Sequence, residues 1–396
     1  MTEWIECTLD KLGEIVGGAT PSTKCEDYYG GSIPWITPKD LSSFKGRYIT
    51  SGERNITEKG LASCSAQMMP KDAVLFTSRA PIGYVAIASQ SVCTNQGFKS
   101  IVVNEKADPL FVYYLLKYNK DAIEAMGSGT TFKEVSGKTM RAVKVRIPLD
   151  VSYQKRIAAV LDSLDTKIEN NERINDDLEQ QAQAIYHERF ETISPNDLPS
   201  EWRIVTLGEV ATISNKSFNP LKEPEILLEH YSIPAFDEAR FPVFELSTSI
   251  KSNKFIIDAS CFMISKLNPT TKRVWKPYCL TGNAVCSTEF IVYKAKDKTI
   301  TDFLYSVIDS NSFSDFMCSH VTGSTGSRQR TTPSDTLSYE LTLPSEDELA
   351  EFQSLVSPMY AQIRINAIEN DRLKRLRDSL LPKLMSGEID VSTIQL

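Results

Sequence analysis

The fold is decided by residues 161–185, which read LDSLDTKIENNERINDDLEQQAQAI. Apolar or small residues recur there at alternating spacings of three and four, which is typical of a coiled-coil seam. The seam positions are Leu161, Leu164, Ile168, Asn171, Asn175, Leu178, Ala182 and Ile185. A second series with this spacing lies near the C-terminus, at Val356, Met359, Ile363, Asn366, Asn370, Leu373, Arg377 and Leu380. The sequence therefore predicts two long amphipathic helices.

The two seams share a pair of asparagines. Asn171 and Asn175, shifted by 195 residues, fall on Asn366 and Asn370. A polar seam residue costs stability but specifies the register in which two helices pair. We therefore expect the two helices to pack on each other. The alternative is that each helix packs only on its own globular domain.

The rest of the chain also contains repeated sequence strings. Each of five short strings has a weaker copy further on: LGEI (residues 12–15, after Trp4) and LGEV (207–210, after Trp202), TSRAPIG (77–83) and ISKLNP (264–269), CTNQGF (93–98) and CSTEF (286–290), GSGTTFK (127–133) and GSTGSRQR (323–330), IPLD (147–150) and LPSE (343–346). The copies keep their order at nearly constant offsets, which indicates an internal repeat. The predicted plan is a globular domain (1–150), a helix (151–191), a second globular domain (199–344) and a second helix (345–390).

Local signals place the elements. Ser345-x-x-Glu348 reads as a capping box, and Ser357-Pro358 as a further N-cap with proline at the first helical position. We therefore expect the longest helix to begin at Pro358 after a short lead-in and to end near Gly387. Strands are predicted at 73–78, 84–88, 145–149, 261–265 and 290–295, and helices at 111–119 and 301–316.

The composition is that of a globular protein of more than one domain, with 396 residues, 41% hydrophobic and 24% charged. No apolar run approaches the roughly 20 residues that span a bilayer, so we expect a cytoplasmic protein without membrane contact. The eight cysteines form no C-x-x-C pair, and the three histidines lack ligand spacing. Reduced cysteines and no zinc site are therefore expected.

The net charge of −7 at first argues against a nucleic-acid partner. The excess acid lies in the two helices, however. Residues 1–150 hold 18 Lys and Arg against 16 Asp and Glu, and residues 199–344 hold 15 against 16. A nearly neutral domain can bind DNA if its basic residues gather on one face.

Catalytic motifs are missing from the sequence. SGKT (136–139) resembles the end of a phosphate-binding loop, but Phe132 stands where the first glycine of that loop would be. The Asn-Pro-Pro-aromatic string of adenine methyltransferases does not occur. Asp165-x-Lys167 could imitate part of a nuclease motif, yet it lies on a predicted helix and is better interpreted as a solvated charge pair. We expect no catalytic residue, no metal and no cofactor in this chain.

These features together resemble the specificity subunits of type I restriction-modification systems. The resemblance covers essentially the whole chain. It is carried by LGEI (12–15), IPWITPKDL (33–41), SRAPIG (78–83), TNQGF (94–98), YQKRIAAVLDSLDTKI (153–168) and LRDSLLPKLMSGEI (376–389). The last two are the most specific and match the conserved spacer helices of that family. The second globular domain departs from the pattern, with SKLNP for SRA-x-G and STEF for TNQ-x-F.

The resemblance implies an α+β fold with two tandem, pseudo-symmetric α/β target-recognition domains separated by two helices in an antiparallel coiled coil. Each domain would read one half of a bipartite, asymmetric site in double-stranded DNA. At 1.5 Å per residue, residues 154–186 span about 50 Å, enough to hold two domains one DNA turn (~34 Å) or more apart. Implied partners are modification (methyltransferase) subunits, expected to be two, and restriction (translocase and nuclease) subunits. Those partners, not this chain, would bind S-adenosylmethionine and ATP.

Base reading needs Arg, Lys, Asn or Gln on loops, and phosphates are contacted by Lys, Arg, Ser, Thr or backbone amides. In the first domain the candidates are Lys39, Lys45, Arg47, Arg79, Asn95, Gln96, Thr130, Thr131 and Lys133. In the second they are Lys266, Lys272, Arg273, Ser327, Arg328, Gln329 and Arg330, of which the run 327–330 ranks first. The alternative for each charged residue is an ordinary surface charge and, for Arg79, a salt bridge within its domain.

Other functions stay open at this point. The chain could instead serve a stand-alone or type IIB-like adenine methyltransferase system, which only neighbouring genes would reveal. The missing motifs argue against an enzyme that acts on DNA alone, and the duplicated Gly-Ser-Arg loops argue against a mere coiled-coil scaffold. Helix residues such as Ala158, Ala159, Ile185, Tyr186 and Phe190 are expected to need covering by partners.

Overall fold

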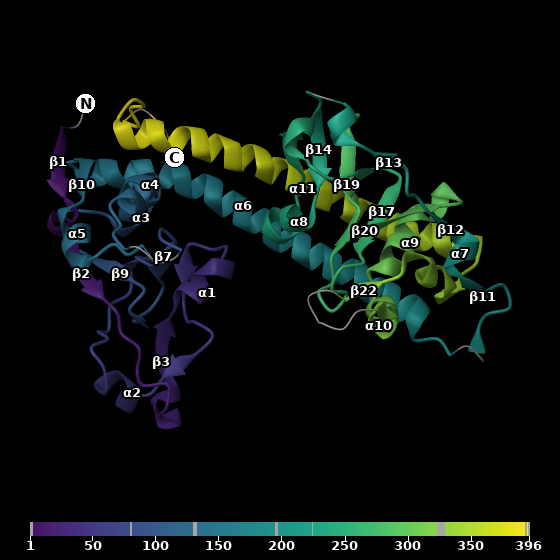
Figure 1. The fold of residues 1–396 in the computed structure, drawn as a ribbon, viewed down its shortest axis with the longest axis horizontal. Coiled ribbons are helices and arrows are strands. Elements are labelled where there is room, and N and C mark those ends of the chain that lie inside the picture. The colour runs from purple at the N-terminus through teal and green to yellow at the C-terminus, as the bar shows by residue number, and fades with distance from the viewer. Residues whose placement is uncertain are drawn as a thin grey trace. The chain divides into compact units, whose positions relative to one another are not determined.

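The computed structural model describes residues 3–79, 81–129, 133–194, 197–223, 225–322, 329–392 and 394. It divides into two compact units, the first made of Met1–Glu169 with Arg372–Leu396 and the second of Asn170–Asp371. Each unit holds one α/β domain and a stretch of each long helix (Figure 1). Thr130, Thr131, Ser327 and Arg328, four of the candidate DNA-contacting residues, lie outside the described residues.

The two long helices are α6 (Val151–Tyr186), which continues as a π-helix over His187–Glu191, and α11 (Glu346–Ser386). Within the second unit they run antiparallel and share two amide pairs. Asn171 Nδ2 donates to Asn370 Oδ1 at 2.8 Å, and Asn366 Nδ2 donates to Asn175 Oδ1 at 2.8 Å. The expectation that the helices pack on each other is confirmed, with the asparagines setting the register.

The observed start of α11 can be compared with the start that the capping signals predict. Ser345 Oγ accepts from Glu348 N–H at 3.4 Å, which is the N-cap half of the predicted capping box, and the hydroxyl donates to Glu348 Oε2 at 3.0 Å. The expected start at Pro358 is wrong, because the helix runs through that residue. Phe352 and Val356, ahead of the proline, are fully buried in the core of the second unit. Their burial outweighs the one backbone hydrogen bond that an internal proline removes.

Gly387 ends α11, as predicted. It adopts φ +79°, a left-handed conformation that favours glycine. A Cβ at this position would lie 2.9 Å from the Trp4 ring, so only glycine lets strand β1 (Trp4–Thr8) pack against the end of the helix.

Among the described residues, the domain of the first unit contains three sheets. Their strand orders are β2-β9-β6-β7-β4, β5-β3-β8 and β1-β10. The strands are β1 (Trp4–Thr8), β2 (Gly13–Gly17), β3 (Tyr29–Ile36), β4 (Tyr48–Ile49), β5 (Asn55–Ile56), β6 (Val74–Phe76), β7 (Val85–Ala88), β8 (Cys93–Thr94), β9 (Lys99–Val103) and β10 (Lys144–Pro148). The helices are α1 (Pro38–Ser43), α2 (Glu58–Ala62), α3 (Pro109–Tyr118), α4 (Lys120–Ala125) and α5 (Gly137–Ala142). The core joins α3 to Ile157 and Leu161 of α6 and to Leu384 and Met385 of α11.

The domain of the second unit has sheets of order β13-β16-β19-β14-β15 and β12-β20-β17-β18. The strands are β11 (Arg203–Thr206), β12 (Ala211–Ile213), β13 (Ser217–Phe218), β14 (Leu227–Tyr231), β15 (Val243–Leu246), β16 (Lys254–Ile256), β17 (Cys261–Ser265), β18 (Val274–Trp275), β19 (Ala284–Ser287), β20 (Phe290–Ala295), β21 (Val321–Thr322), β22 (Arg330–Thr331) and β23 (Glu340–Leu343). The helices are α7 (Leu207–Val210), α8 (Ile233–Ala239), α9 (Thr301–Ile308) and α10 (Asn311–Ser319). The helix expected at 301–316 is thus two helices, because Ser310 accepts from Phe313 N–H and caps α10.

The core of the second unit corrects one expectation about the helix faces. Tyr186 and Phe190 are each 4% exposed and pack against Phe303 and Phe352. They are covered by their own unit and need no partner for that purpose. Ala158 is likewise buried, in the core of the first unit.

The repeat is present in the strand pairing. Antiparallel β1–β10 corresponds to β11–β23, and parallel β3–β8 corresponds to β14–β19. The match of LGEI to LGEV is wrong, however. Leu9 N–H donates to Val143 O as Leu207 N–H does to Tyr339 O, so Leu207 is the counterpart of Leu9, at an offset of 198. Accordingly, LGEV forms helix α7 whereas most of LGEI lies in strand β2.

Candidate nucleic-acid interface

Strands β3 and β8 bring two of the quoted motifs together in the first unit. They pair in parallel, Trp35 with Cys93 and Ile36 with Thr94, so that IPWITPKDL and TNQGF leave the sheet at the same end. Asn95 N–H donates to Ile36 O at 3.0 Å. Beyond β3, Thr37 and Asp40 form a capping box that starts α1. The chain therefore turns sharply at both motifs, as a loop that presents side chains must.

Two further loops join this end of the domain. Ser78 N–H donates to Gly97 O at 2.7 Å, and Val135 N–H donates to Ser78 O at 2.9 Å. A Cβ on Gly97 would lie 2.8 Å from Cγ of Pro38, so the close approach requires glycine. We call residues 36–40, 78–79, 95–97 and 133–135 the first loop cluster. Four segments far apart in sequence thus form one surface.

Arg79 lies in this cluster, and the interpretation that it forms a salt bridge within its domain is confirmed. Its Nη2 is 3.0 Å from Glu134 Oε2, and its side chain is still 46% exposed. Glu134 also lies 3.7 Å from Nζ of Lys99, whose pKa is lowered by burial. Arg79 is therefore salt-bridged within its domain and accessible to a ligand.

The amide side chains of the cluster use their oxygens within the domain. Asn95 Oδ1 accepts from Gly97 N–H at 2.8 Å, and Gln96 Oε1 accepts from the Thr20 hydroxyl. The NH₂ group of such an amide is able to donate to an adenine N7 or a phosphate oxygen. Lys39 is 79% exposed and pairs with Glu53 at 2.7 Å. Lys45 and Lys133 are also exposed.

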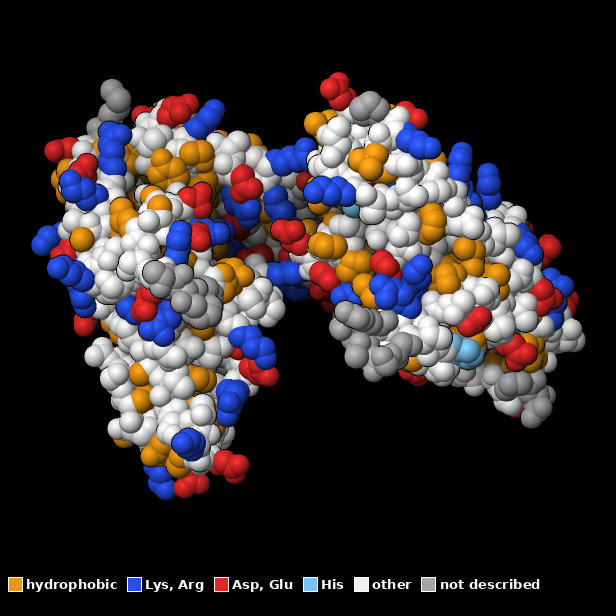
Figure 2. All heavy atoms as spheres, in the orientation of Figure 1, with side chains coloured by type: hydrophobic (Ala, Val, Ile, Leu, Met, Phe, Trp, Pro, Cys, Tyr) orange, Lys and Arg blue, Asp and Glu red, His pale blue; other side chains and the backbone are white. Residues whose placement is uncertain are grey.

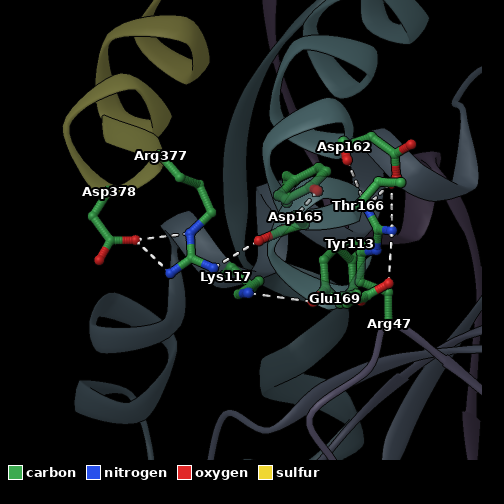
Figure 3. A network of polar contacts seen from close by, with 10 residues as sticks. Arg47, Tyr113, Lys117, Asp162, Asp165, Thr166, Glu169, Arg377 and Asp378 are labelled. Carbon is green, nitrogen blue, oxygen red and sulfur yellow. Dashed lines mark hydrogen bonds and ion pairs between the residues drawn. The ribbon is translucent and has the colours of Figure 1, made fainter. Parts of the chain in front are cut away.

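Arg47 corrects the prediction that it contacts DNA. Its side chain is only 7% exposed and points at α6 (Figure 3). The guanidinium donates to Asp162 O at 3.0 Å, to Thr166 Oγ1 at 2.8 Å and to Glu169 Oε2 at 3.1 Å, and it also contacts the Asp162 carboxylate. A buried arginine with these partners anchors the segment after α1 to the long helix.

Asp165 is a second buried group that the sequence did not reveal. It is 5% exposed, so the interpretation as a solvated charge pair is wrong. Arg377 Nη1 lies 2.7 Å from it (Figure 3). Tyr114 Oη donates to it at 2.8 Å, so α3, α6 and α11 are joined at this carboxylate. The signal that could have found it was Arg377, a charge at a position of the apolar seam.

The second unit contains an equivalent group of loops. Lys266 N–H donates to Glu289 O at 2.9 Å, Thr331 N–H donates to Lys266 O at 3.1 Å, and Asn268 N–H donates to Gln329 O at 2.9 Å. This is the same three-way joining found around Ser78. We call residues 265–268, 287–289 and 329–331 the second loop cluster. Candidates Lys266, Gln329 and Arg330 belong to it.

Three predicted cations of the second unit have acidic partners. Arg330 is 43% exposed and bidentate to Glu289, with Nε and Nη2 at 3.0 and 3.1 Å. Arg273 is also bidentate, to Asp237 at 2.6 and 2.9 Å, but only 13% exposed. Lys272 Nζ lies 3.0 Å from Asp309 and donates to its backbone oxygen at 2.7 Å. Arg273 and Lys272 therefore hold the β17–β18 hairpin to the neighbouring helices, while Arg330 stays accessible.

The distribution of charged side chains on the visible surface agrees with this pairing of basic and acidic residues. On the face shown in Figure 2, Lys and Arg side chains of each unit are interspersed with Asp and Glu. Among the described residues, no group of three or more His, Cys, Asp or Glu is placed to hold a metal ion. None of the helices in the described ranges is both long and apolar enough to cross a membrane.

Comparison with known proteins places the chain in a family. The family described as "Type I restriction modification DNA specificity domain" matches residues 1–180. The type I restriction enzyme MjaIX specificity subunit of Methanocaldococcus jannaschii is 32% identical over 99% of this chain and 95% of its own length. The EcoR124I/EcoR124II specificity subunit of Escherichia coli is 29% identical over 40% of each chain. This chain belongs to the type I restriction enzyme specificity subunits.

A solved structure has the same fold. The crystal structure of the type I restriction-modification system S subunit from M. genitalium gives a TM-score of 0.61, covering 97% of this chain and 96% of that one at 16% identity. The match extends over both globular domains and both long helices. The predicted α+β architecture, with two recognition-type domains and two spacer helices, is confirmed.

Proposed function

We propose that this chain is the sequence-specific DNA-recognition subunit of a type I restriction-modification complex and reads a bipartite, asymmetric site. The observation that carries the proposal is the likeness to a type I specificity subunit over 99% of the chain. Two loop clusters built on one plan support it, because each can read one half of the site.

The loop side chains supply the chemistry of recognition. In the first cluster, the amides of Asn95 and Gln96 would read base edges, while Lys39 and Lys133 would contact phosphates, as would Lys45 outside the cluster. In the second, Gln329 and Arg330 would read bases, and Lys266 would contact a phosphate. Thr130, Thr131, Ser327 and Arg328 belong to the same two loops by sequence and remain candidates.

The proposed partners are modification subunits, two per chain, and restriction subunits. They would bind S-adenosylmethionine and ATP and carry out methylation, translocation and cleavage. This chain would contribute recognition and no catalytic residue. In the alternative, it serves a stand-alone or type IIB-like adenine methyltransferase system. Purification of the native complex separates the two, because only a type I system contains the restriction subunit.

The decisive experiment is to co-express the chain with the methyltransferase encoded beside it and to map methylated adenines across the host genome by single-molecule sequencing. We expect one motif made of two specified halves with a fixed gap of unspecified bases. A short continuous motif, or none, would contradict the proposal.

A substitution in one loop sharpens this test. Gln96→Ala removes a candidate base-reading amide, so we expect a relaxed base in one half of the motif, with discrimination there lowered about 10- to 100-fold. The other half should be unchanged. Gln90→Ala is the matched control, since Gln90 only donates to Thr50 O outside the cluster. Equal loss of both halves would show that Gln96 supports folding rather than reading.

A further inference from the structure

Each loop cluster holds an exposed arginine with a glutamate of the same cluster. In the first unit, Arg79 pairs with Glu134 at 3.0 Å. In the second, Arg330 pairs with Glu289 through two hydrogen bonds of 3.0 and 3.1 Å. All four side chains are between 29% and 46% exposed, so the pairs lie at the surface that the proposed function assigns to DNA.

The two pairs are built from different positions of the repeat. In the first cluster the arginine belongs to the SRAPIG segment and the glutamate follows the Gly-Ser loop. In the second, the glutamate belongs to the STEF segment and the arginine follows the Gly-Ser loop. The repeat therefore does not explain the pairing residue by residue. The same arrangement occurs twice with the partners placed on different loops.

The geometry places a carboxylate where DNA would offer an acceptor. Glu289 takes Nε and Nη2 of Arg330 with its two oxygens, which is the planar fork that also recognises phosphate or the O6 and N7 edge of guanine. The arginine cannot use that fork for DNA and for Glu289 at once. Glu134 competes for Arg79 through one oxygen in the same way.

The pairs contribute little to folding. Ion pairs at the surface, with both side chains partly exposed as here, are screened by water and salt and are weak. Their effect on DNA is larger, because a carboxylate in the reading surface repels the phosphates of every sequence. Only a site with matching base contacts offsets this repulsion, and such a built-in penalty increases discrimination.

We propose that Glu134 and Glu289 are specificity-determining residues that occupy their arginines with a carboxylate in place of a DNA acceptor and thereby weaken binding to non-cognate DNA. This inference rests on the proposed function. It adds that two acidic residues inside the recognition loops, rather than basic ones alone, set the selectivity.

The test uses the complex with its methyltransferase subunits and two duplexes of equal length, one carrying the mapped motif and one with the motif scrambled. For Glu289→Gln and Glu134→Gln we expect affinity for the scrambled duplex to rise about tenfold and for the motif duplex to rise less. The slope of log affinity against log salt should steepen by about one for each variant. Melting temperatures should stay within a degree or two of the wild type.

Two controls separate a local effect from a change in net charge. Glu351→Gln removes a carboxylate paired with Arg189 at 2.8 Å, and Glu6→Gln removes one paired with Lys144 at 3.2 Å. Both pairs lie outside the loop clusters, so neither variant should alter the ratio of the two affinities. A control that matches Glu289→Gln would overturn the proposal, as would an unchanged ratio or a loss of affinity for both duplexes.

A double substitution tests whether the effect of Glu289→Gln depends on Arg330. In an Arg330→Gln background, Glu289→Gln should give less than half of its effect on the scrambled duplex, because the released arginine is absent. A full effect in that background would contradict the stated mechanism. If the wild-type complex itself does not distinguish the duplexes, the proposed function fails, and that outcome differs from every outcome that rejects this inference alone.

Discussion

The two units attach their globular domains to the long helices with different chemistry at corresponding positions. In the first, Tyr114 of α3 donates to Asp165 of α6, which also contacts Arg377 of α11. In the second, Ser306 of α9 meets Tyr360 of α11 at 2.8 Å. An ionic junction in one unit is thus a pair of neutral hydroxyls in the other.

Other contacts between the domains and the long helices differ in the same way, with ionic side chains in the first unit and aromatic ones in the second. The first unit adds Arg47, bonded to three side chains of α6, to its junction. The second unit instead packs Tyr186, Phe190, Phe303 and Phe352 against one another, in the same core as Tyr360. Burial of aromatic side chains is strongly stabilising and does not depend on the relative orientation of the groups, because the hydrophobic effect is non-directional. A buried ionic network, in contrast, is stable only when every charge keeps its partner. The repeat fixes where the domain meets the helices, not which forces hold it there.

The largest effect that separates the two units is expected from Phe352→Ala. Phe352 is fully buried, and its removal leaves a cavity among three rings, which should lower the free energy of unfolding by about 4 kcal/mol. Hydrogen exchange should show the loss in the second unit. Leu355→Ala, at a 41% exposed position of the same helix, is the control and should cost less than about 1 kcal/mol. A loss shared equally by both units would contradict the comparison.

A smaller effect, in the first unit, is expected from Asp165→Asn. The amide still accepts from Tyr114 but leaves the Arg377 guanidinium paired only with exposed Asp378, so unfolding should become easier by about 2–3 kcal/mol. Urea denaturation measures the change. Replacing both partners, as in Asp165→Leu with Arg377→Met, should recover much of it. A double variant as unstable as the sum of two single variants would show that the charges are not coupled.

The smallest effect concerns the stability of the second unit at acidic pH. Burial alone would raise the pKa of Asp258 in the second unit, but hydrogen bonds from Lys294 and Ser260 lower it to about 2. Because this pKa lies below the unfolded value near 3.8, the stabilisation is present above about pH 4 and is lost as the pH falls towards 2. The carboxylate is 56% exposed, so less than about 1 kcal/mol is involved.

Asp258→Asn should therefore flatten the acid limb of stability against pH between about 4 and 2. Urea midpoints at several pH values measure the slope, with Asp335→Asn as a control at another aspartate of the same unit. A slope equal to that of the wild type would show that Asp258 does not titrate as described.

The helices and their register could be predicted because the signal is local in sequence. A seam repeats every few residues, and the spacing of Asn171 and Asn175 recurs at Asn366 and Asn370. Signals that depend on tertiary contact failed. The predicted helix began at Pro358, but the real one begins at Glu346, since two apolar residues ahead of the proline are buried. LGEI and LGEV share three letters, yet the contacts of Leu9 and Leu207 decide which positions correspond.

The candidate site was predictable to the level of its loops. The motif strings located the segments that meet at Ser78, Gly97 and Lys266, because turns and strand ends leave a pattern in sequence. Whether each charged side chain is buried or exposed, and which residue it pairs with, was not predictable. Arg47 is buried against α6, while Arg79 and Arg330 are held by acids more than 40 residues away in the chain. No local pattern records such a partner.

The contribution of the C-terminus to the first unit has a consequence for how the protein is made. Leu384, Met385 and Val391 belong to the same core as Leu9 and Phe111. A ribosome adds them only after all of Asn170–Asp371 has been synthesised. The domain at the beginning of the chain is therefore the later of the two to receive all of its core residues. A product that ends between Asp371 and Leu384 would contain every residue of the second unit and an incomplete first one.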